Sequence, residues 1–178
     1  MNEALKLDNY THEDYLNIDK STTENIELID GKIYMMAGAS ALHQDIVLNL
    51  GYLLKNLSKL DQKCLPRIAP FDLKLSSNDR IHIVQPDLML FFHDETPCAI
   101  FEVLSPSTAY KDTTVKKELY EANGIREYFL VNPEFKIIEK FILEDEKYFY
   151  DKAYGIEESI GILCLDQEIQ VAEVFESL

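Results

Sequence analysis

Hydrophobic residues along the chain form one long helical repeat, a shorter one and several strand-like runs. From Ser40 to about Leu60 they recur every three or four positions, which predicts an amphipathic helix that Ser40 caps and that packs on a sheet. A second helix is predicted from about Asp112 to Asn123, with Asp112 as its N-cap and Gly124 just beyond its end.

Short apolar runs bounded by turn residues predict strands before, between and after these helices. In the segment IELIDGKIYMM, Asp30-Gly31 separates two such runs and is a strong signal for a two-residue hairpin. Other strand segments are predicted at residues 62–75, 80–85, 126–132, 136–143, 147–150 and 162–165. Thr11 is expected to cap a short peripheral helix, and Val174 and Phe175 to form a last helical turn. Strands on both sides of a helix that returns to the same sheet indicate an α/β fold of mixed strand direction.

The most informative stretch is residues 86–104. Two apolar runs, Leu88–Phe92 and Cys98–Phe101, flank the polar segment His93–Pro97, which is the pattern of a β-hairpin. If the hairpin is centred between residues 94 and 95, Asp87 lies opposite Glu102 and the two carboxylates share one face of the sheet.

Two carboxylates that face each other across a strand pair are about 5 Å apart at Cβ and repel unless a cation or a proton lies between them. A hard divalent cation, Mg²⁺ or Mn²⁺, held by Asp87 and Glu102 resolves the repulsion and leaves positions for water and a phosphate oxygen. The alternative is structural: Pro86-Asp87 is ordinary strand-start chemistry, and Glu102 is then a solvent-facing position of a one-sided sheet.

Length and composition limit the class of protein. A chain of 178 residues can bury a hydrophobic core without disulfides or a structural metal, so we expect a single domain over residues 1–178. The sequence has no apolar run of 18 residues, so no membrane partner is expected. Cys64, Cys98 and Cys164 are odd in number and widely spaced, which argues against a disulfide framework and for a reducing compartment. These features predict a cytoplasmic protein.

The net charge of −15 at first opposes a nucleic-acid partner, because phosphate contacts require Lys and Arg. The charge is concentrated at the two ends of the chain, whereas residues 43–132 carry 12 acidic and 10 basic side chains. A nearly neutral middle segment that also holds the candidate metal ligands is compatible with a phosphate-bearing substrate.

Three further residues are candidates on position alone. Glu27 lies in the first predicted strand, where a surface position is the simpler interpretation. His43 lies one turn before the apolar positions of the long helix, so it is either a satisfied residue at the edge of the core or a group that orients water or phosphate. Lys116 borders the buried face of the second helix together with Tyr120, while Lys117 is turned toward solvent.

Taken together, several blocks resemble the Uma-two family, which belongs to the restriction-endonuclease-like, or PD-(D/E)XK, superfamily. The blocks occur in the family's order and spacing over about the first three quarters of the chain: IELIDGKIYMM, Ser40 to His43, QPDLML, FEVLSPST, Asp112-x-x-x-Lys116-x-x-x-Tyr120 and GIREYFLVNP. The resemblance implies a mixed β-sheet flanked by helices, with extra hairpins at the N-terminal and C-terminal ends.

The superfamily signature is matched by Pro86-Asp87 and Glu102, but the position where it has lysine is Leu104. The resemblance implies that Lys116, on the following helix, takes the role of that lysine. It also implies that Glu27 is an additional acidic member of the site. His43, Gln85 and Tyr120 are implied as residues around it.

The resemblance implies a metal-dependent endonuclease that hydrolyses phosphodiester bonds in DNA with Mg²⁺ or Mn²⁺. A homodimer is expected from the family analogy and from the apolar edge of the late hairpin. The alternative function is a catalytically inactive adaptor or assembly domain that keeps the nuclease fold, favoured by the sequence pI near 4.6 and by Leu104.

Overall fold

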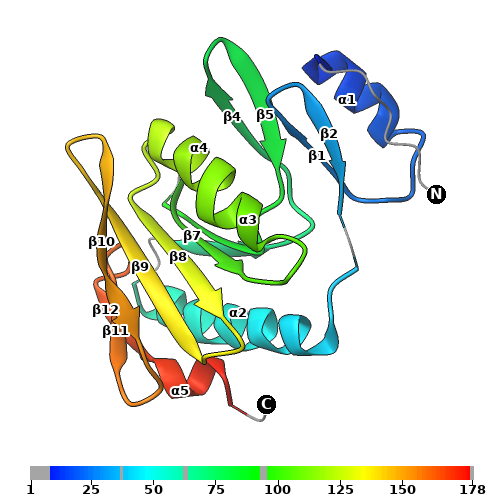
Figure 1. Cartoon of the computed structure of the whole chain (residues 1–178). Coiled ribbons are helices and arrows are strands. Elements are labelled where there is room, and N and C mark those ends of the chain that lie inside the picture. Colours follow the sequence, from blue (N-terminus) through cyan, green and yellow to red (C-terminus); the bar gives the residue numbers. More distant parts are fainter. Residues whose placement is uncertain (1–8, 37, 62–63, 93–95, 177–178) are drawn as a thin grey trace. The chain divides into compact units, whose positions relative to one another are not determined.

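The computed structural model describes residues 9–36, 38–61, 64–92 and 96–176, which divide into two compact units (Figure 1). The smaller unit comprises residues 1–38 and 72–85, and the larger comprises residues 39–71 and 86–178. Each unit has its own sheet and its own hydrophobic core. Among the described residues, no helix is long and apolar enough to cross a membrane.

The smaller unit consists of one helix and a four-stranded antiparallel sheet of order β2-β1-β5-β4. Its elements are α1 (His12–Asp19), β1 (Ile26–Ile29), β2 (Lys32–Met35), β4 (Leu73–Ser77) and β5 (Arg80–Val84). Thr11 caps α1 through a reciprocal capping box with Asp14, as predicted. Asp30 and Gly31 both have positive φ, 51° and 71°, which is what a two-residue hairpin turn requires.

The larger unit contains a six-stranded sheet of order β10-β9-β8-β7-β6-β3. Its strands are β3 (Leu65–Ile68), β6 (Leu88–Phe91), β7 (Pro97–Val103), β8 (Glu127–Asn132), β9 (Ile137–Glu144) and β10 (Lys147–Tyr154). β7 and β8 are parallel and every other neighbouring pair is antiparallel, so the predicted mixed sheet is confirmed.

Helices lie on both faces of this sheet (Figure 1). Helix α2 (Ala41–Asp61) packs its apolar repeat, including Ile46 and Leu50, against Leu88, Leu90 and other strand residues that point to its side. The opposite face is covered by one continuous helical segment made of α3 (Ala109–Lys111), η1 (Asp112–Lys116) and α4 (Lys117–Ala122). The predicted long helix is confirmed almost to the residue.

The helix opposite α2 differs from its prediction at the start. It begins at Ala109, so Asp112 is not an N-cap but a buried residue at the start of η1, a π-helical stretch. The predicted end is confirmed, because Gly124 has a φ of 73°. Two hydrogen bonds close the helix there, from Gly124 N–H to Glu121 O (3.1 Å) and from Ile125 N–H to Tyr120 O (3.1 Å).

The C-terminal part adds a small hairpin and a last helical turn: β11 (Ser159–Ile162), β12 (Gln167–Gln170) and α5 (Val171–Val174). The strand predicted at residues 162–165 is wrong, because these residues end β11 and enter the turn. The buried carboxylate of Glu127 explains the turn's position: it accepts the amides of Leu163 (2.9 Å) and Cys164 (3.0 Å) and pairs with Lys140 (3.0 Å).

The cysteine prediction is also corrected. A disulfide joins Cys98 on β7 to Cys164 in this turn, with the two Cα atoms 6.1 Å apart. Cys64 is buried, and its thiol donates a hydrogen bond to the carbonyl oxygen of Cys164 (3.1 Å). The two bonded cysteines are 66 residues apart in the chain, so only the folded structure brings them together.

Candidate active site

The β6–β7 hairpin has the predicted register from Leu88 to Leu90, but a bulge after Leu90 pairs Phe91 with Pro97 and departs from it toward the turn. Leu88 pairs with Phe101 and Leu90 with Ala99, so Asp87 continues the ladder opposite Glu102. The Asp87 amide donates to Oε2 of Glu102 (3.3 Å), and Oδ2 of Asp87 accepts the amide of Val103 (2.7 Å). The two carboxylates therefore lie together where β6 begins and β7 ends; the turn residues 93–95 lie outside the described residues.

Glu102 is the centre of a buried polar cluster. Its side chain is 3% exposed, and its Oε1 accepts hydrogen bonds from Nζ of Lys116 (3.0 Å) and from the hydroxyl of Tyr120 (2.7 Å). The Lys116 ammonium also lies 3.6 Å from Oδ1 of Asp112. A buried ammonium is tolerated only when it is paired and hydrogen-bonded, and two carboxylates fulfil that condition here.

The second helix supplies Asp112, Lys116 and Tyr120 from one side because they are spaced by four residues. The π-helical stretch η1 runs over the first two of them, and the hydroxyl of Tyr128 donates to the carbonyl oxygen of Asp112 (2.8 Å). π-Helical stretches of this kind recur at functional sites. The local backbone thus places Lys116 between Glu102 and Asp112.

The prediction that Lys117 points to solvent is wrong. Lys117 is half-buried, and its ammonium lies over the ring of Phe141 on β9, 3.8 Å from the ring centroid. The sequence pattern could not reveal this contact, because Phe141 comes from a strand that follows the helix in the chain.

His43 reaches the site from the start of α2. Its amide donates to Oγ of Ser40 (3.2 Å), which supports the predicted cap, and its Nε2 lies 3.1 Å from Oδ2 of Asp87. The hydrogen bond to Asp87 is the main cause that raises the pKa of His43 above its usual range, while burial opposes the rise. Nδ1 of His43 is buried and has no hydrogen-bond partner among the described residues.

Glu27 and Gln85 belong to the smaller unit. Glu27 is fully buried and its Oε1 accepts the backbone amide of Gln85 (3.1 Å), so the interpretation as a surface strand position is wrong. The side chain of Gln85 donates to Oδ1 of Asp72 (2.9 Å), whose Oδ2 accepts the hydroxyl of Tyr15 (3.0 Å). The sequence could not reveal the burial of Glu27 by alternation of exposed and buried positions, because all four residues of β1 are buried.

The chemistry of the two carboxylates fits a hard divalent cation. Asp87 and Glu102 provide oxygen donors, which Mg²⁺ and Mn²⁺ prefer. Within residues 9–36, 38–61, 64–92 and 96–176, no group of three or more His, Cys, Asp or Glu side chains is arranged to hold a metal ion. A cation at this position would therefore take one or two carboxylates and complete its shell with water, which is the usual arrangement for Mg²⁺.

Asp112 also differs from its prediction as an N-cap. Its carboxylate was expected at a helix N-terminus, but it is 2% exposed and contacts Lys116. The four-residue spacing of Asp112 and Lys116 is the signal that could have identified the contact.

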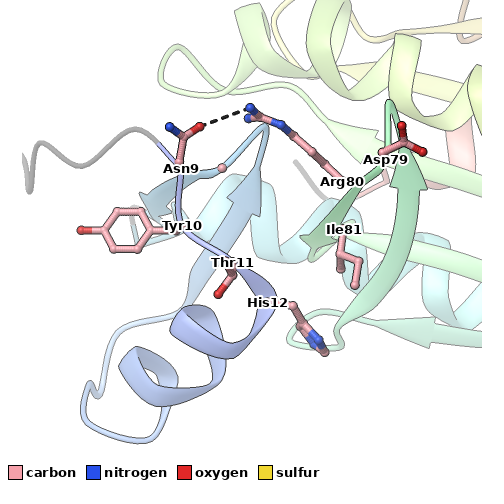
Figure 2. A pocket seen from close by; sticks show the side chains of 8 residues that line it. Asn9, Tyr10, Thr11, His12, Asp79, Arg80 and Ile81 are labelled. Atoms are coloured by element: carbon pink, nitrogen blue, oxygen red, sulfur yellow. Dashed lines mark hydrogen bonds between the residues drawn. The ribbon is translucent and has the colours of Figure 1, made fainter.

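A hollow in the smaller unit is separate from these groups. It is lined by residues of the α1 start and of the turns of both hairpins, among them Asn9, Thr11, Gly31 and Arg80 (Figure 2). The Arg80 guanidinium donates to the carbonyl oxygen of Asp30 (2.8 Å) and to Oδ1 of Asn9 (3.2 Å). These bonds give Arg80 a structural role, and the lining contains no pair of facing carboxylates like that of Asp87 and Glu102.

Comparisons with known proteins agree on the fold. A crystal structure described as a putative nuclease belonging to DUF820 from Anabaena variabilis is similar with a TM-score of 0.70 at 15% identity, covering 90% of this chain and 96% of that one. That similarity shows the restriction-endonuclease-like fold.

Two relatives come from Synechocystis sp. The uncharacterized protein slr1290 is 33% identical over 131 residues, which cover 67% of each chain. The uncharacterized protein sll1609 is 32% identical over 134 residues, covering 68% of this chain and 74% of the other. The profile of the Uma2 (Uma-two) family, described as "Putative restriction endonuclease", matches residues 12–170 and supports a nuclease-like function. The chain therefore belongs to the Uma2 family.

Proposed function

We propose that this protein is a metal-dependent endonuclease that hydrolyses phosphodiester bonds in DNA. The observation that carries the proposal is the meeting of Asp87, Glu102 and Lys116, with Lys116 Nζ 3.0 Å from Glu102 and the Asp87 amide 3.3 Å from the same carboxylate. Two acids and a lysine at one end of a strand pair are the groups that metal-assisted phosphate hydrolysis uses.

In this proposal Asp87 and Glu102 hold Mg²⁺ or Mn²⁺. The cation, when bound, supplies Lewis-acid polarisation of the phosphate and lowers the pKa of a water molecule. The ammonium of Lys116 stabilises the negative charge that develops on the phosphate, and Asp112 keeps that ammonium in place. Tyr120 orients Glu102 through its hydroxyl bond of 2.7 Å.

Three other residues have proposed supporting roles. Nε2 of His43 orients the Asp87 carboxylate through their contact of 3.1 Å. Glu27 is proposed as an additional acidic residue of the reaction on the basis of the family resemblance. Gln85, whose amide binds Glu27, would then fix the orientation of that acid.

We further propose that the protein acts as a homodimer in which both units of residues 1–178 work as one domain. The feature that favours a dimer is β10, an outer strand of the larger sheet that, within the described residues, pairs with β9 alone and exposes 54% of Phe149 and 53% of Tyr150. Exposed apolar side chains on an unpaired strand edge favour pairing with a second chain.

The second candidate function is an adaptor that keeps the fold without cleaving. The net charge of −15 and the absence of a lysine at position 104 favour it. The presence of Asp87 beside the buried pair of Glu102 and Lys116 favours the enzyme, because an inactive descendant has no reason to keep paired charges in its interior.

A cleavage assay distinguishes the two functions. Single-stranded DNA, duplex DNA and RNA are incubated with the wild type in Mg²⁺, in Mn²⁺ and in EDTA, next to the Glu102→Gln variant. We expect DNA cleavage that requires the cation and that is lost in Glu102→Gln, which keeps the shape of the side chain without its charge. Equal cleavage by Glu102→Gln would place the activity outside the site of Asp87 and Glu102, and no cleavage of any substrate would favour the adaptor.

A further inference from the structure

We propose that Arg67 and Phe71 form a contact point for a single-stranded nucleic acid beside the candidate active site, a few nucleotides from the phosphate that is cleaved. Arg67 binds the phosphate backbone, and an unpaired base stacks on the platform that Arg67 and Phe71 build. This inference rests on the proposed nuclease function and adds to it the form of the substrate.

The strand register places Arg67 on the same face of the sheet as Glu102. Arg67 on β3 pairs with Met89 on β6, which pairs with Ile100 on β7. Cross-strand partners share a face, and Glu102 is two residues from Ile100, so its side chain points to that face as well. The next residue of β3, Ile68, points to the other side, where its side chain lies close to Gly51 of α2.

The end of β3 is tied directly to Asp87. The amide of Ala69 donates to the carbonyl oxygen of Asp87 (3.1 Å), which extends the β3–β6 pairing by one residue. Arg67 therefore lies on the strand next to Asp87 and two residues along it. From strand spacings, the two Cα atoms are about 8 Å apart, a distance that a nucleic acid strand spans in about two to three nucleotides.

The guanidinium of Arg67 is held over two aromatic rings. Its central carbon lies 4.7 Å from the ring centroid of Phe71 and 4.4 Å from that of Phe91, and the two rings meet edge to face at 5.9 Å. Phe91 is buried beneath, whereas Phe71 is 38% exposed and Arg67 is exposed. Cation–π contacts fix a guanidinium without using up its N–H donors, so these donors remain available for a phosphate.

The charge around Arg67 supports an anionic ligand. Among the described residues, no carboxylate forms an ion pair with Arg67, although the chain has 32 acidic side chains against 17 basic ones. In so acidic a protein, an exposed arginine that has no carboxylate partner among the described residues and lies on the strand next to the candidate metal ligand Asp87 is suited to a phosphate.

The aromatic part of the platform selects the form of the nucleic acid. Phe71 and the Arg67 guanidinium offer flat surfaces, on which bases stack when their faces are free. In a duplex these faces are covered by neighbouring base pairs, so a double strand would use the charge of Arg67 and not the ring of Phe71. The platform is therefore matched to an unpaired strand.

The test is a binding measurement in EDTA, where cleavage cannot interfere. Fluorescence anisotropy is recorded for a labelled single-stranded DNA oligonucleotide and for its duplex, over a series of salt concentrations. The variants are Arg67→Ala, Arg67→Lys, Phe71→Leu and Phe71→Tyr. Lys55→Ala is the matched charge control, because Lys55 is exposed on α2 at the opposite face of the sheet. Phe135→Ala is the matched aromatic control, because Phe135 is 67% exposed between β8 and β9.

We expect Phe71→Leu to weaken single-strand binding at least about fivefold, the lower end of what one stacked base contributes, and Phe71→Tyr to leave it unchanged. Arg67→Ala should weaken binding and lower the slope of log K against log salt by about 0.7, the value for one phosphate contact on a single strand. Arg67→Lys should keep the salt slope and lose affinity. Both controls should bind as the wild type does.

Wild-type affinity in Phe71→Leu, or a wild type that binds duplex more tightly than single strand, would overturn the inference. So would an equal loss of affinity in Arg67→Ala and Lys55→Ala, since it would indicate charge without a site. These outcomes are independent of the cleavage assay: an active nuclease with unaffected Arg67 and Phe71 variants would refute only this inference. Binding that depends on Phe71 in a protein that cleaves nothing would refute only the nuclease.

Discussion

The Lys116 ammonium is enclosed by two carboxylates, 3.0 Å from Glu102 and 3.6 Å from Asp112. Burying charged groups is costly, and removing one partner of a buried pair usually destabilises a protein more than the pair stabilised it. A cluster of this kind is therefore retained more readily for chemistry than for stability. Any variant of Lys116 must be assessed for folding as well as for rate.

Lys116→Ala should lower kcat by on the order of 10²–10³, because one preorganised donor to transition-state charge is lost. Lys117→Ala is the matched control: its ammonium lies over Phe141, and it should leave kcat nearly unchanged. Both variants are measured at the same metal and salt concentrations, with circular dichroism to verify folding. Equal rates for Lys116→Ala and the wild type would return Lys116 to a structural role.

His43 makes the stability of the protein depend on pH. Its pKa is raised in the folded state, mainly by the hydrogen bond to Asp87. A raised pKa contributes stability that is fully present below the unfolded-state value and is lost as the pH rises through the folded-state value. In EDTA, the advantage in unfolding free energy of the wild type over His43→Gln should therefore shrink as the pH rises above about 6.5, the ordinary histidine value. Urea titrations across this range measure it, and an advantage that grows with pH would contradict the assignment.

The helical segment from Ala109 to Ala122 has to end sharply for β8 to begin beside β7. Gly124 provides the end with a φ of 73°, and an added Cβ would meet nothing within 4 Å. Gly124→Ala should therefore lower the unfolding free energy by roughly 1 kcal/mol, which is the cost of holding alanine at a positive φ.

Gly161→Ala is the control for Gly124→Ala. A Cβ at Gly161 would also meet nothing within 4 Å, but its φ is not positive. The unfolding free energy of this variant, measured in urea, should equal that of the wild type or be slightly higher, because alanine restricts the unfolded chain. Equal destabilisation of both variants would mean that something other than the positive φ decides the cost.

Binding of a cation should raise the unfolding free energy of the whole molecule. A metal that binds only the folded state adds RT ln(1 + [L]/Kd), about 2.7 kcal/mol when its concentration is 100 times Kd. We expect Mn²⁺ or Mg²⁺ to raise the melting temperature of the wild type and to have no such effect on Glu102→Gln. An equal shift in both proteins would show that the ion binds elsewhere on this acidic chain.

The proposed homodimer has a direct test in sedimentation velocity at micromolar concentration. The wild type should sediment as a dimer. Phe149→Lys combined with Tyr150→Lys should sediment as a monomer, because charges on an exposed strand edge oppose pairing. A wild type that sediments as a monomer would contradict the proposed homodimer.

The sequence by itself determined the features that depend on neighbours in the chain. The hairpin register that sets Asp87 beside Glu102 follows from two apolar runs on either side of a short polar segment, and the capping box of Thr11 and the turn at Asp30-Gly31 follow from local backbone chemistry. The helix from Ser40 follows from a repeat of three and four residues. Each of these is a local preference that the fold reinforces.

Tertiary structure alone decided the features that depend on residues far apart in the chain. These are the burial of Glu27, the contact of Lys117 with Phe141 and the bond between Cys98 and Cys164. The place of Asp112 inside a π-helical stretch, where Tyr128 of a later strand binds its carbonyl oxygen, is another. Whether a charge is buried and what it contacts is set by packing between elements, and periodicity within one element contains no information about its partners.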